Sequence, residues 1–197
     1  MFKKVAVTGH AAGIGKSFYD YFSRISEVKG FDIVNGYNIE TPEKILEESR
    51  NCDLFINNAC SDVNSSQAQL AEQWFNLHRN DPYFIIHISS ILVKTDIVLP
   101  EPLRLYTDAK KKVEEIHNKI NIESCNCRSI VVSPGIVDTP RVKRFDPLIL
   151  SVYSKLKDNN SLLTADDVMY ATVKNLEMIN ERYFPSLIEI SNRKLQM

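Results

Sequence analysis

The chain has 197 residues, of which 44% are hydrophobic and 25% charged, the balance of one ordinary globular domain with a real core. Its 24 basic and 25 acidic residues give a net charge of −1 with no basic stripe, which argues against nucleic acid as a main partner. No apolar run is long enough to span a bilayer and the first residues lack a signal-peptide pattern, so we expect a cytoplasmic protein with no membrane partner.

Short apolar runs alternate with longer amphipathic segments along the chain. The runs predict strands at Lys4–Thr8, Glu27–Asp32, Cys52–Ile56, Tyr83–Ser89, Cys127–Ser133 and Pro185–Ile190. The amphipathic segments predict helices at Gly13–Ser26, at 41–51 with Thr41 as the N-cap before Pro42, and at Gln67–Leu77, Leu105–Ile120 and Thr164–Met178. The alternation of strands and helices along the chain predicts an α/β fold. We expect a Rossmann-type doubly wound parallel sheet of about six to seven strands with helices on both faces.

A glycine-rich turn follows the first strand, at Thr8–Gly15 (TGHAAGIG). Glycines there let the backbone turn tightly and approach a pyrophosphate, while the helix N-terminus supplies N–H donors. Asp32 ends the second strand, near where dinucleotide folds place an acidic residue. Its carboxylate would accept hydrogen bonds from ribose hydroxyls and repel a 2′-phosphate, which favours NAD(H) over NADP(H). A solvated charge at a strand end is the alternative.

A second interpretation of this turn is a P-loop nucleotide triphosphatase. Gly15-Lys16-Ser17 matches the end of the phosphate-binding motif G-x-x-x-x-G-K-[ST]. The first glycine of that motif would have to stand at position 10, which is His10, and Gly9 comes one residue too early. The P-loop remains the less favoured alternative.

Three Y-x-x-x-K patterns occur, at Tyr106–Lys110, Tyr153–Lys157 and Tyr170–Lys174. Residues four apart share one helical face, so a tyrosine and a lysine at this spacing can reach the same pocket. A neighbouring ammonium would lower the pKa of the phenol and prepare it for proton exchange. Because the spacing occurs three times, it does not by itself identify a site.

The ordered set of motifs from Val5 to Thr139 resembles the short-chain dehydrogenase/reductase family. The set comprises the glycine-rich turn, Asn57-Asn58-Ala59, the pair Ser89-Ser90, Tyr106-x-x-x-Lys110, and the segment 133–139 (SPGIVDT). The family carries its Tyr–Lys pair between a strand ending in Ser-Ser and one ending in Pro-Gly, which selects Tyr106 and Lys110 over the two other pairs.

This resemblance implies a carbonyl or alcohol oxidoreductase with a small-molecule substrate, built as one domain over residues 1–197 with a substrate-covering segment at about 140–165. Tyr106 would donate the proton, Ser90 would orient the substrate oxygen, and Lys110 would lower the phenol pKa and bind the nicotinamide ribose. The backbone of Ile136 and the hydroxyl of Thr139 would hold the nicotinamide carboxamide. The residues expected to bind the cofactor are Thr8, Gly9, Gly13, Ile14, Gly15, Asp32, Asn38, Asn58, Ala59, Tyr106, Lys110, Pro134, Gly135, Ile136 and Thr139.

The chain also departs from the family pattern. Cys60 stands where a glycine is expected, and the short stretch between Asp32 and Asn57 predicts that one helix–strand unit is pared down, with Asn38 standing in for the residue that contacts adenine. Asn64 is a guess for the helix asparagine of the family's catalytic set.

Two further expectations concern partners and metals. A homo-oligomer is expected, and the alternative to an enzyme is a dinucleotide-binding sensor without turnover. The pair Cys125-Asn126-Cys127 lacks a second pair or a nearby histidine, so no metal is expected.

Overall fold

A computed structural model describes residues 2–61, 64–96, 98–124, 126–142, 147–179 and 183–192. Its centre is a six-stranded parallel sheet in the order β2-β1-β3-β4-β5-β6. The strands are β1 (Lys4–Thr8), β2 (Glu27–Phe31), β3 (Leu54–Asn57), β4 (Phe84–Ile88), β5 (Arg128–Pro134) and β6 (Leu187–Ile190). The predicted fold class, including the number of strands, is confirmed.

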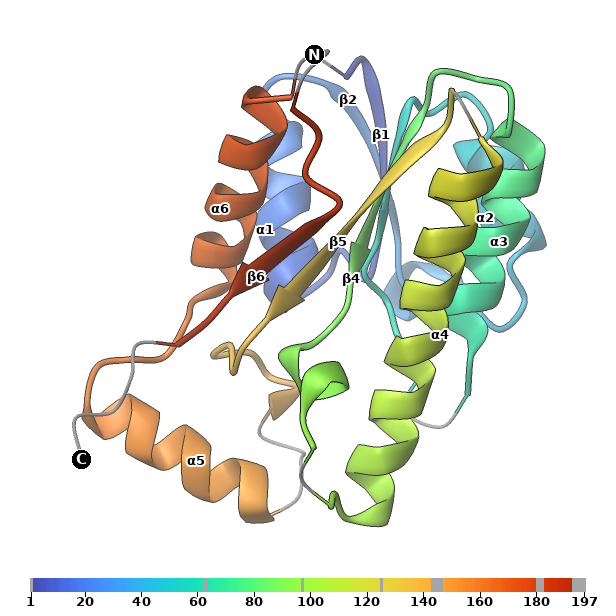
Figure 1. Ribbon diagram of the computed structural model, residues 1–197. Helices are drawn as coiled ribbons and strands as arrows, with labels where there is room; N and C mark the ends of the chain where they lie inside the picture. Colours follow the sequence, from blue (N-terminus) through green and yellow to red (C-terminus); the bar gives the residue numbers. More distant parts are fainter. Residues whose placement is uncertain are drawn as a thin grey trace.

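Helices cover both faces of the sheet. They are α1 (Gly13–Phe22), α2 (Glu43–Ser49), α3 (Ser66–His78), α4 (Glu101–Glu123), α5 (Pro147–Asp158) and α6 (Ala165–Glu177), with short 3-10 helices η1 (Ile33–Asn35) and η2 (Ile91–Lys94). Figure 1 shows α1 and α6 on one face, α2, α3 and α4 on the other, and α5 beyond the carboxyl ends of β5 and β6. The sheet is therefore doubly wound, and its carboxyl edge carries η2, the first turns of α4, and α5.

Apolar side chains fill both interfaces between sheet and helices. On the α1/α6 face, Val5 and Val7 of β1 pack with Phe18 and other large side chains. On the opposite face, Ala6 packs in the cluster that contains Trp74 of α3. Because successive strand residues point to opposite faces and both faces are covered, the strands are continuous apolar runs, as the sequence indicated.

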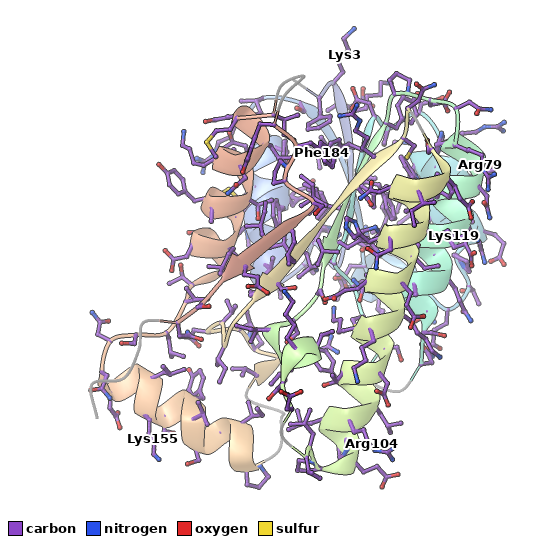
Figure 2. The ribbon with its side chains drawn as sticks, viewed as in Figure 1. Lys3, Arg79, Arg104, Lys119, Lys155 and Phe184 are labelled. Atoms are coloured by element: carbon purple, nitrogen blue, oxygen red, sulfur yellow. The ribbon has the colours of Figure 1, made fainter. Side chains whose placement is uncertain are left out.

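Polar contacts join α3 and α4 at the surface. The Lys119 ammonium lies 2.6 Å from the Glu72 carboxylate, and Arg79 lies 3.2 Å from Glu123. Figure 2 shows Arg79 and Lys119 on the outer side of this helix pair. Exposed pairs of this kind contribute little to stability. Within the described residues, no helix is long and apolar enough to cross a bilayer.

Some element boundaries differ from those predicted. Helix α2 begins at Glu43 with Pro42 as its N-cap and no side-chain cap bond, so the prediction of Thr41 as the cap is wrong. Helix α4 begins at Glu101, one turn earlier than predicted. Thr164, the first residue of the last predicted helix, is the N-cap of α6 and forms a capping box with Asp167.

The pared-down unit is visible in the strand order. After β2 the chain passes through η1 and α2 directly to β3, which pairs with the other side of β1. Strand β2 is therefore the edge of the sheet. Because β2 and β3 flank β1 on opposite sides, the strand order reverses at β1, and ligands of open α/β sheets bind at the carboxyl ends of the strands at such a switch point.

Candidate active site

The Thr8 hydroxyl ties β1 to β3 at this switch point. Thr8 Oγ1 donates to the Ile56 carbonyl (3.3 Å) and accepts from the backbone N–H groups of Asn58 and Ala59 (both 3.0 Å). The Asn58 amide in turn donates to the carbonyls of Thr8 (3.0 Å) and Gly9 (3.4 Å). Three predicted cofactor residues thus fix the start of the glycine-rich turn.

The glycine-rich turn can be built only with glycine at its key positions. Gly9 and Gly13 have φ of +68° and +56°, in the left-handed region that disfavours other residues. A Cβ on Gly15 would lie 2.1 Å from the Gly9 carbonyl oxygen, so the helix could not approach the turn so closely. The Ile14 side chain is partly buried and packs against the apolar core.

The N-terminus of α1 fits a pyrophosphate. Its N-cap, Ala12, provides no side-chain cap bond, and the first turn holds no acidic residue. The first N–H groups of a helix have no intrahelical partner, and the helix dipole adds partial positive charge there. A dinucleotide phosphate supplies the acceptors that this turn lacks, so the residues present fit the cofactor that the sequence implied.

Asp32 follows β2 at the same edge. Its carboxylate accepts from the Ala11 N–H (3.3 Å) in the glycine-rich turn and from the Val34 N–H (3.2 Å) in η1. The carboxylate is thereby held against the glycine-rich turn. Asn38, the other residue predicted at the adenosine end, is exposed and accepts from the Glu40 N–H in its own loop (3.0 Å).

Lys16 argues against the P-loop interpretation. Its ammonium lies 2.5 Å from the Asp20 carboxylate, one turn further along α1. A P-loop lysine must reach terminal phosphates in front of the helix. Lys16 instead extends along the helix surface, away from the turn.

Tyr106 and Lys110 occupy one face of α4. The Lys110 ammonium lies 5.6 Å from the centre of the Tyr106 ring. Lys110 is only 3% exposed and donates to the Ile88 carbonyl at the end of β4 (2.6 Å) and to Gln67 Oε1 (2.8 Å). Tyr106 is half-buried, with the Arg141 guanidinium 5.5 Å from its ring centre. A phenol with two cations beside its ring is suited to proton exchange, because positive charge stabilises the phenolate.

The two other Tyr–Lys pairs have different surroundings. The Tyr153 hydroxyl donates to the Asp138 carboxylate (2.8 Å), which joins α5 to the segment after β5, and this hydrogen bond raises the pKa of Tyr153. The Lys174 ammonium lies 5.5 Å from the Tyr170 ring centre, the same arrangement as in Tyr106–Lys110, but Tyr170 is 61% exposed on α6. Only the Tyr106 pair lies at the carboxyl edge with a buried ammonium.

Ser90 lies where β4 ends. It is buried and caps η2, accepting from the Leu92 N–H (3.3 Å). Leu92 packs against the cluster that contains Leu103 of α4, one turn before Tyr106, so η2 and the first turns of α4 share one apolar contact. Ser89, in contrast, donates to Glu114 (2.6 Å) on the flank of α4.

The segment after β5 reaches the glycine-rich turn. A Cβ on Gly13 would lie 3.1 Å from the Thr139 methyl group, so the two predicted cofactor residues face each other. Pro134 is the buried last residue of β5, and Gly135 donates its N–H to the Ile190 carbonyl (2.8 Å). The fold thus brings the segment after β5 next to the glycine-rich turn.

Ile136 differs from the expectation for the nicotinamide carboxamide. The Asn192 side chain accepts from the Ile136 N–H (2.8 Å) and donates to its carbonyl oxygen (2.9 Å). A Cβ on Gly135 would lie 2.4 Å from the Asn192 oxygen, so glycine is needed for this contact. The backbone of Ile136 is therefore already bound, and it could hold a carboxamide only after Asn192 moves.

The sequence did not point to two residues that the structure brings to the site, Gln67 and Asn192. The sequence pattern could have indicated Gln67, because it places this amide on the apolar face of α3 with Leu70 and Trp74, an unusual position for a polar side chain. Asn64, the guess for the family asparagine, accepts from the Ser66 N–H (3.0 Å) and is exposed. Cys125 lies outside the described residues, while Cys127 is a buried free thiol.

Comparison with known proteins supports the fold alone. No family model matches the sequence, and no curated protein matches it. Solved structures that share its fold cover nearly the whole chain. A short-chain dehydrogenase/reductase family oxidoreductase from Burkholderia thailandensis has a TM-score of 0.72 at 19% identity, covering 97% of this chain and 91% of its own. The 3-alpha-hydroxysteroid dehydrogenase from Pseudomonas sp. B-0831, complexed with NADH, has 0.67 at 16%, covering 96% and 95%.

A third structure, described as a ribose-5-phosphate isomerase from Brucella melitensis 16M, has a TM-score of 0.69 at 17% identity and covers 96% of this chain and 90% of its own. The same fold thus appears under more than one activity, and function must be argued from the site. Strand order, layers and near-complete coverage agree with the resemblance found in the sequence. The fold of this chain is that of the short-chain dehydrogenases/reductases.

Proposed function

We propose that this protein is a nicotinamide-dinucleotide oxidoreductase that interconverts a small carbonyl compound and its alcohol, with NAD(H) favoured over NADP(H). Tyr106 is the proton donor in reduction, Ser90 orients the substrate oxygen, and Lys110 stabilises the phenolate. The observation that carries the proposal is the buried, doubly hydrogen-bonded Lys110 beside the Tyr106 ring, at the edge of the sheet that also holds the glycine-rich turn.

The bound dinucleotide supplies a hydride acceptor or donor. The turn at Gly9–Gly15 binds the pyrophosphate through backbone N–H groups, and Asp32 accepts from the adenosine ribose hydroxyls. A 2′-phosphate at that place would meet the Asp32 carboxylate, which supports the preference for NAD(H).

The protein's own residues manage the proton. Tyr106 gives its phenolic proton to the carbonyl oxygen as that oxygen gains negative charge, and Ser90 donates a hydrogen bond to the same oxygen. The Lys110 ammonium stabilises the phenolate that remains. In alcohol oxidation the phenolate takes the proton back.

Tyr106→Phe is the test of this function. The change removes one oxygen and leaves shape nearly unchanged, so loss of turnover cannot be ascribed to packing. General acid–base catalysis contributes about 10²–10⁴-fold, and kcat is expected to fall by that factor with the affinity for NADH nearly unchanged. The measurement is NADH oxidation at 340 nm over a panel of carbonyl compounds, with NADH binding followed by calorimetry.

Tyr170→Phe is the matched control, because its lysine has the same distance to the ring but the pair is on the exposed side of α6. It is expected to leave turnover unchanged. Equal rates in the wild type and both variants would exclude Tyr106 as the acid. NADH binding without turnover of any carbonyl in the wild type would favour the non-catalytic sensor instead.

A further inference from the structure

A closed polar cluster lies beneath the Tyr106–Lys110 pair. It joins Gln67 in the first turn of α3, Asn57 at the end of β3, Ile88 at the end of β4 and Lys110 in α4. Gln67 is 1% exposed, Lys110 3% and Asn57 fully buried. An unsatisfied buried polar group is costly, and of the amide and ammonium groups of this cluster only Asn57 Oδ1 lacks a hydrogen-bond partner among the described residues.

The orientation of the Gln67 amide is fixed by its neighbours. Gln67 Nε2 donates to the carbonyls of Asn57 (2.7 Å) and Ile88 (3.1 Å). Only the NH₂ end of an amide can donate, so these two carbonyls turn the oxygen end toward Lys110. The Asn57 amide closes the cluster by donating to the backbone carbonyl of Gln67 (3.1 Å).

Lys110 receives two of its acceptors from this cluster, Gln67 Oε1 at 2.8 Å and the Ile88 carbonyl at 2.6 Å. The Ile88 carbonyl also accepts from Gln67, so Gln67 and Lys110 share one acceptor and locate each other. A lysine carries its ammonium at the end of a flexible four-carbon chain, so the ammonium stays in place only where acceptors hold it.

We infer that Gln67 is the positioning residue for Lys110: its amide, locked by the carbonyls of Asn57 and Ile88, holds the ammonium beside the Tyr106 ring. The role of Gln67 in catalysis rests on the proposed function, whereas its effect on the position of the ammonium does not.

The test compares Gln67→Met with Gln69→Met. Methionine keeps the length of glutamine and removes the amide, and Gln69 is an exposed glutamine on the same helix, which makes it the matched control. Lys110 labelling is read by reductive methylation and mass spectrometry without cofactor. Lys110 is expected to be labelled at least several-fold faster in Gln67→Met than in the wild type or in Gln69→Met.

A second readout follows the Tyr106 ring by ¹³C NMR of labelled tyrosine, assigned with Tyr106→Phe. Displacing the ammonium is expected to raise the pH at which Tyr106 ionises by about 1 unit, the size of effect a nearby charge exerts. Turnover is expected to fall about 10- to 100-fold, the loss that corresponds to a hydrogen bond to a charged group.

Gln67→Glu is the conservative variant, since it retains an oxygen facing Lys110 and loses the two donors. It is expected to keep Lys110 protected from labelling. If Gln67→Met does not fold, Gln67→Asn, one methylene too short to reach Lys110 and both carbonyls together, gives the same comparison.

Equal labelling and an unchanged Tyr106 titration in Gln67→Met and Gln69→Met would overturn the inference. Both readouts are made without cofactor or substrate. An inactive wild type would therefore overturn the proposed function and leave the inference about Gln67 intact. Unchanged labelling and titration in Gln67→Met would overturn the inference and leave the proposed function intact.

Discussion

At the scale of single residues, the identity of a side chain says less about its role than its surroundings do. Tyr106–Lys110 and Tyr170–Lys174 have the same spacing and nearly the same ammonium-to-ring distance. Helix periodicity alone produces that distance. The difference is burial, because Lys110 is held by two acceptors in the interior while Lys174 pairs with Glu177 at the surface.

Two buried histidines make stability depend on pH. Burial lowers the pKa of His87 to about 3 and that of His117 to about 4. The rings are 6.2 Å apart. His87 Nδ1 lies 3.3 Å from the Asn57 amide nitrogen, which can only donate, so the neutral ring carries its proton on Nε2. Both rings are therefore uncharged in the folded protein at neutral pH.

The free energy of unfolding is expected to fall as the pH drops from about 6.5 toward 4. Over this range the unfolded chain binds protons at both histidines and the folded chain does not, and each contributes about 1.4 kcal/mol per pH unit. The stabilising effect is present above pH 6.5 and is lost on acidification. Urea unfolding at several pH values measures the slope.

His87→Leu is expected to reduce that slope by about 1.4 kcal/mol per pH unit, whatever it does to stability at pH 7. His78→Leu is the control substitution: it also replaces a buried histidine by leucine, but the His78 ring lies beside the Asp81 carboxylate (3.0 Å). The pH slope of the free energy of unfolding is compared between the two variants. A slope that is the same in the wild type and in His87→Leu would contradict the assignment of a neutral buried His87.

The sequence predicted the site residues whose roles come from backbone geometry or from local spacing. Gly9 and Gly13 have the positive φ that the motif requires, and Lys110 lies one turn from Tyr106 as the spacing demands. It did not predict Gln67 or Asn192, whose contacts cross 43 and 56 residues of sequence to Lys110 and Ile136. Long-range pairing of amides leaves no local pattern in a single sequence.

At the scale of elements, the glycine-rich turn is the part of the fold with least tolerance for change. Gly15→Ala would place a Cβ 2.1 Å from the Gly9 oxygen and 2.6 Å from the Asn58 amide, so backbone must move. We expect it to destabilise the protein by about 1–3 kcal/mol and to abolish dinucleotide binding. Thermal unfolding and NADH calorimetry measure the two effects.

Gly36→Ala is the control for conformational strain. Gly36 has a φ of +86° but no atom within 4 Å of its would-be Cβ. Gly36→Ala is therefore expected to lower the free energy of unfolding by about 1–2 kcal/mol, through backbone conformation alone. Retained NADH binding in Gly36→Ala together with loss in Gly15→Ala is the expected result, and retained binding in Gly15→Ala would contradict the close approach described for the turn.

Most elements could be predicted because their apolar period is strong. Helix α5 (Pro147–Asp158) was expected only as part of a substrate-covering segment, since it packs through Ile149 and Tyr153 on a small cluster away from the main core. The N-cap of α2 was misplaced because Pro42 fits either the cap or the first helical position. Helix η2 is too short for a periodic signal.

At the scale of the whole molecule, the shortened sheet keeps the switch point at which open α/β sheets bind ligands. NADH at about 100 times its dissociation constant is expected to stabilise the fold by about 2.7 kcal/mol. For a chain of this length that corresponds to a rise in Tm of about 5–10 °C. Scanning fluorimetry with matched concentrations of NADH and NADPH measures the effect.

The rise is expected to be larger with NADH than with NADPH, because of the Asp32 carboxylate. Asp32→Ala is expected to narrow the difference between the Tm rises with NADH and with NADPH. It also removes the contacts to Ala11 and Val34, so the Tm without cofactor is expected to be lower. A greater rise with NADPH in the wild type would reject the cofactor preference while leaving the fold assignment intact.

The loss of one helix–strand unit leaves β2 with an open side. An edge strand presents unpaired backbone donors and acceptors, which is a template for aggregation. In β2 the exposed positions are Glu27, paired with Lys4 at 3.3 Å, and Lys29, bonded to the Glu48 carbonyl. Charged side chains on an edge oppose the docking of another strand. Because the sheet is shortened at this edge, its resistance to aggregation there depends on Glu27 and Lys29, two charged residues that the proposed chemistry does not use.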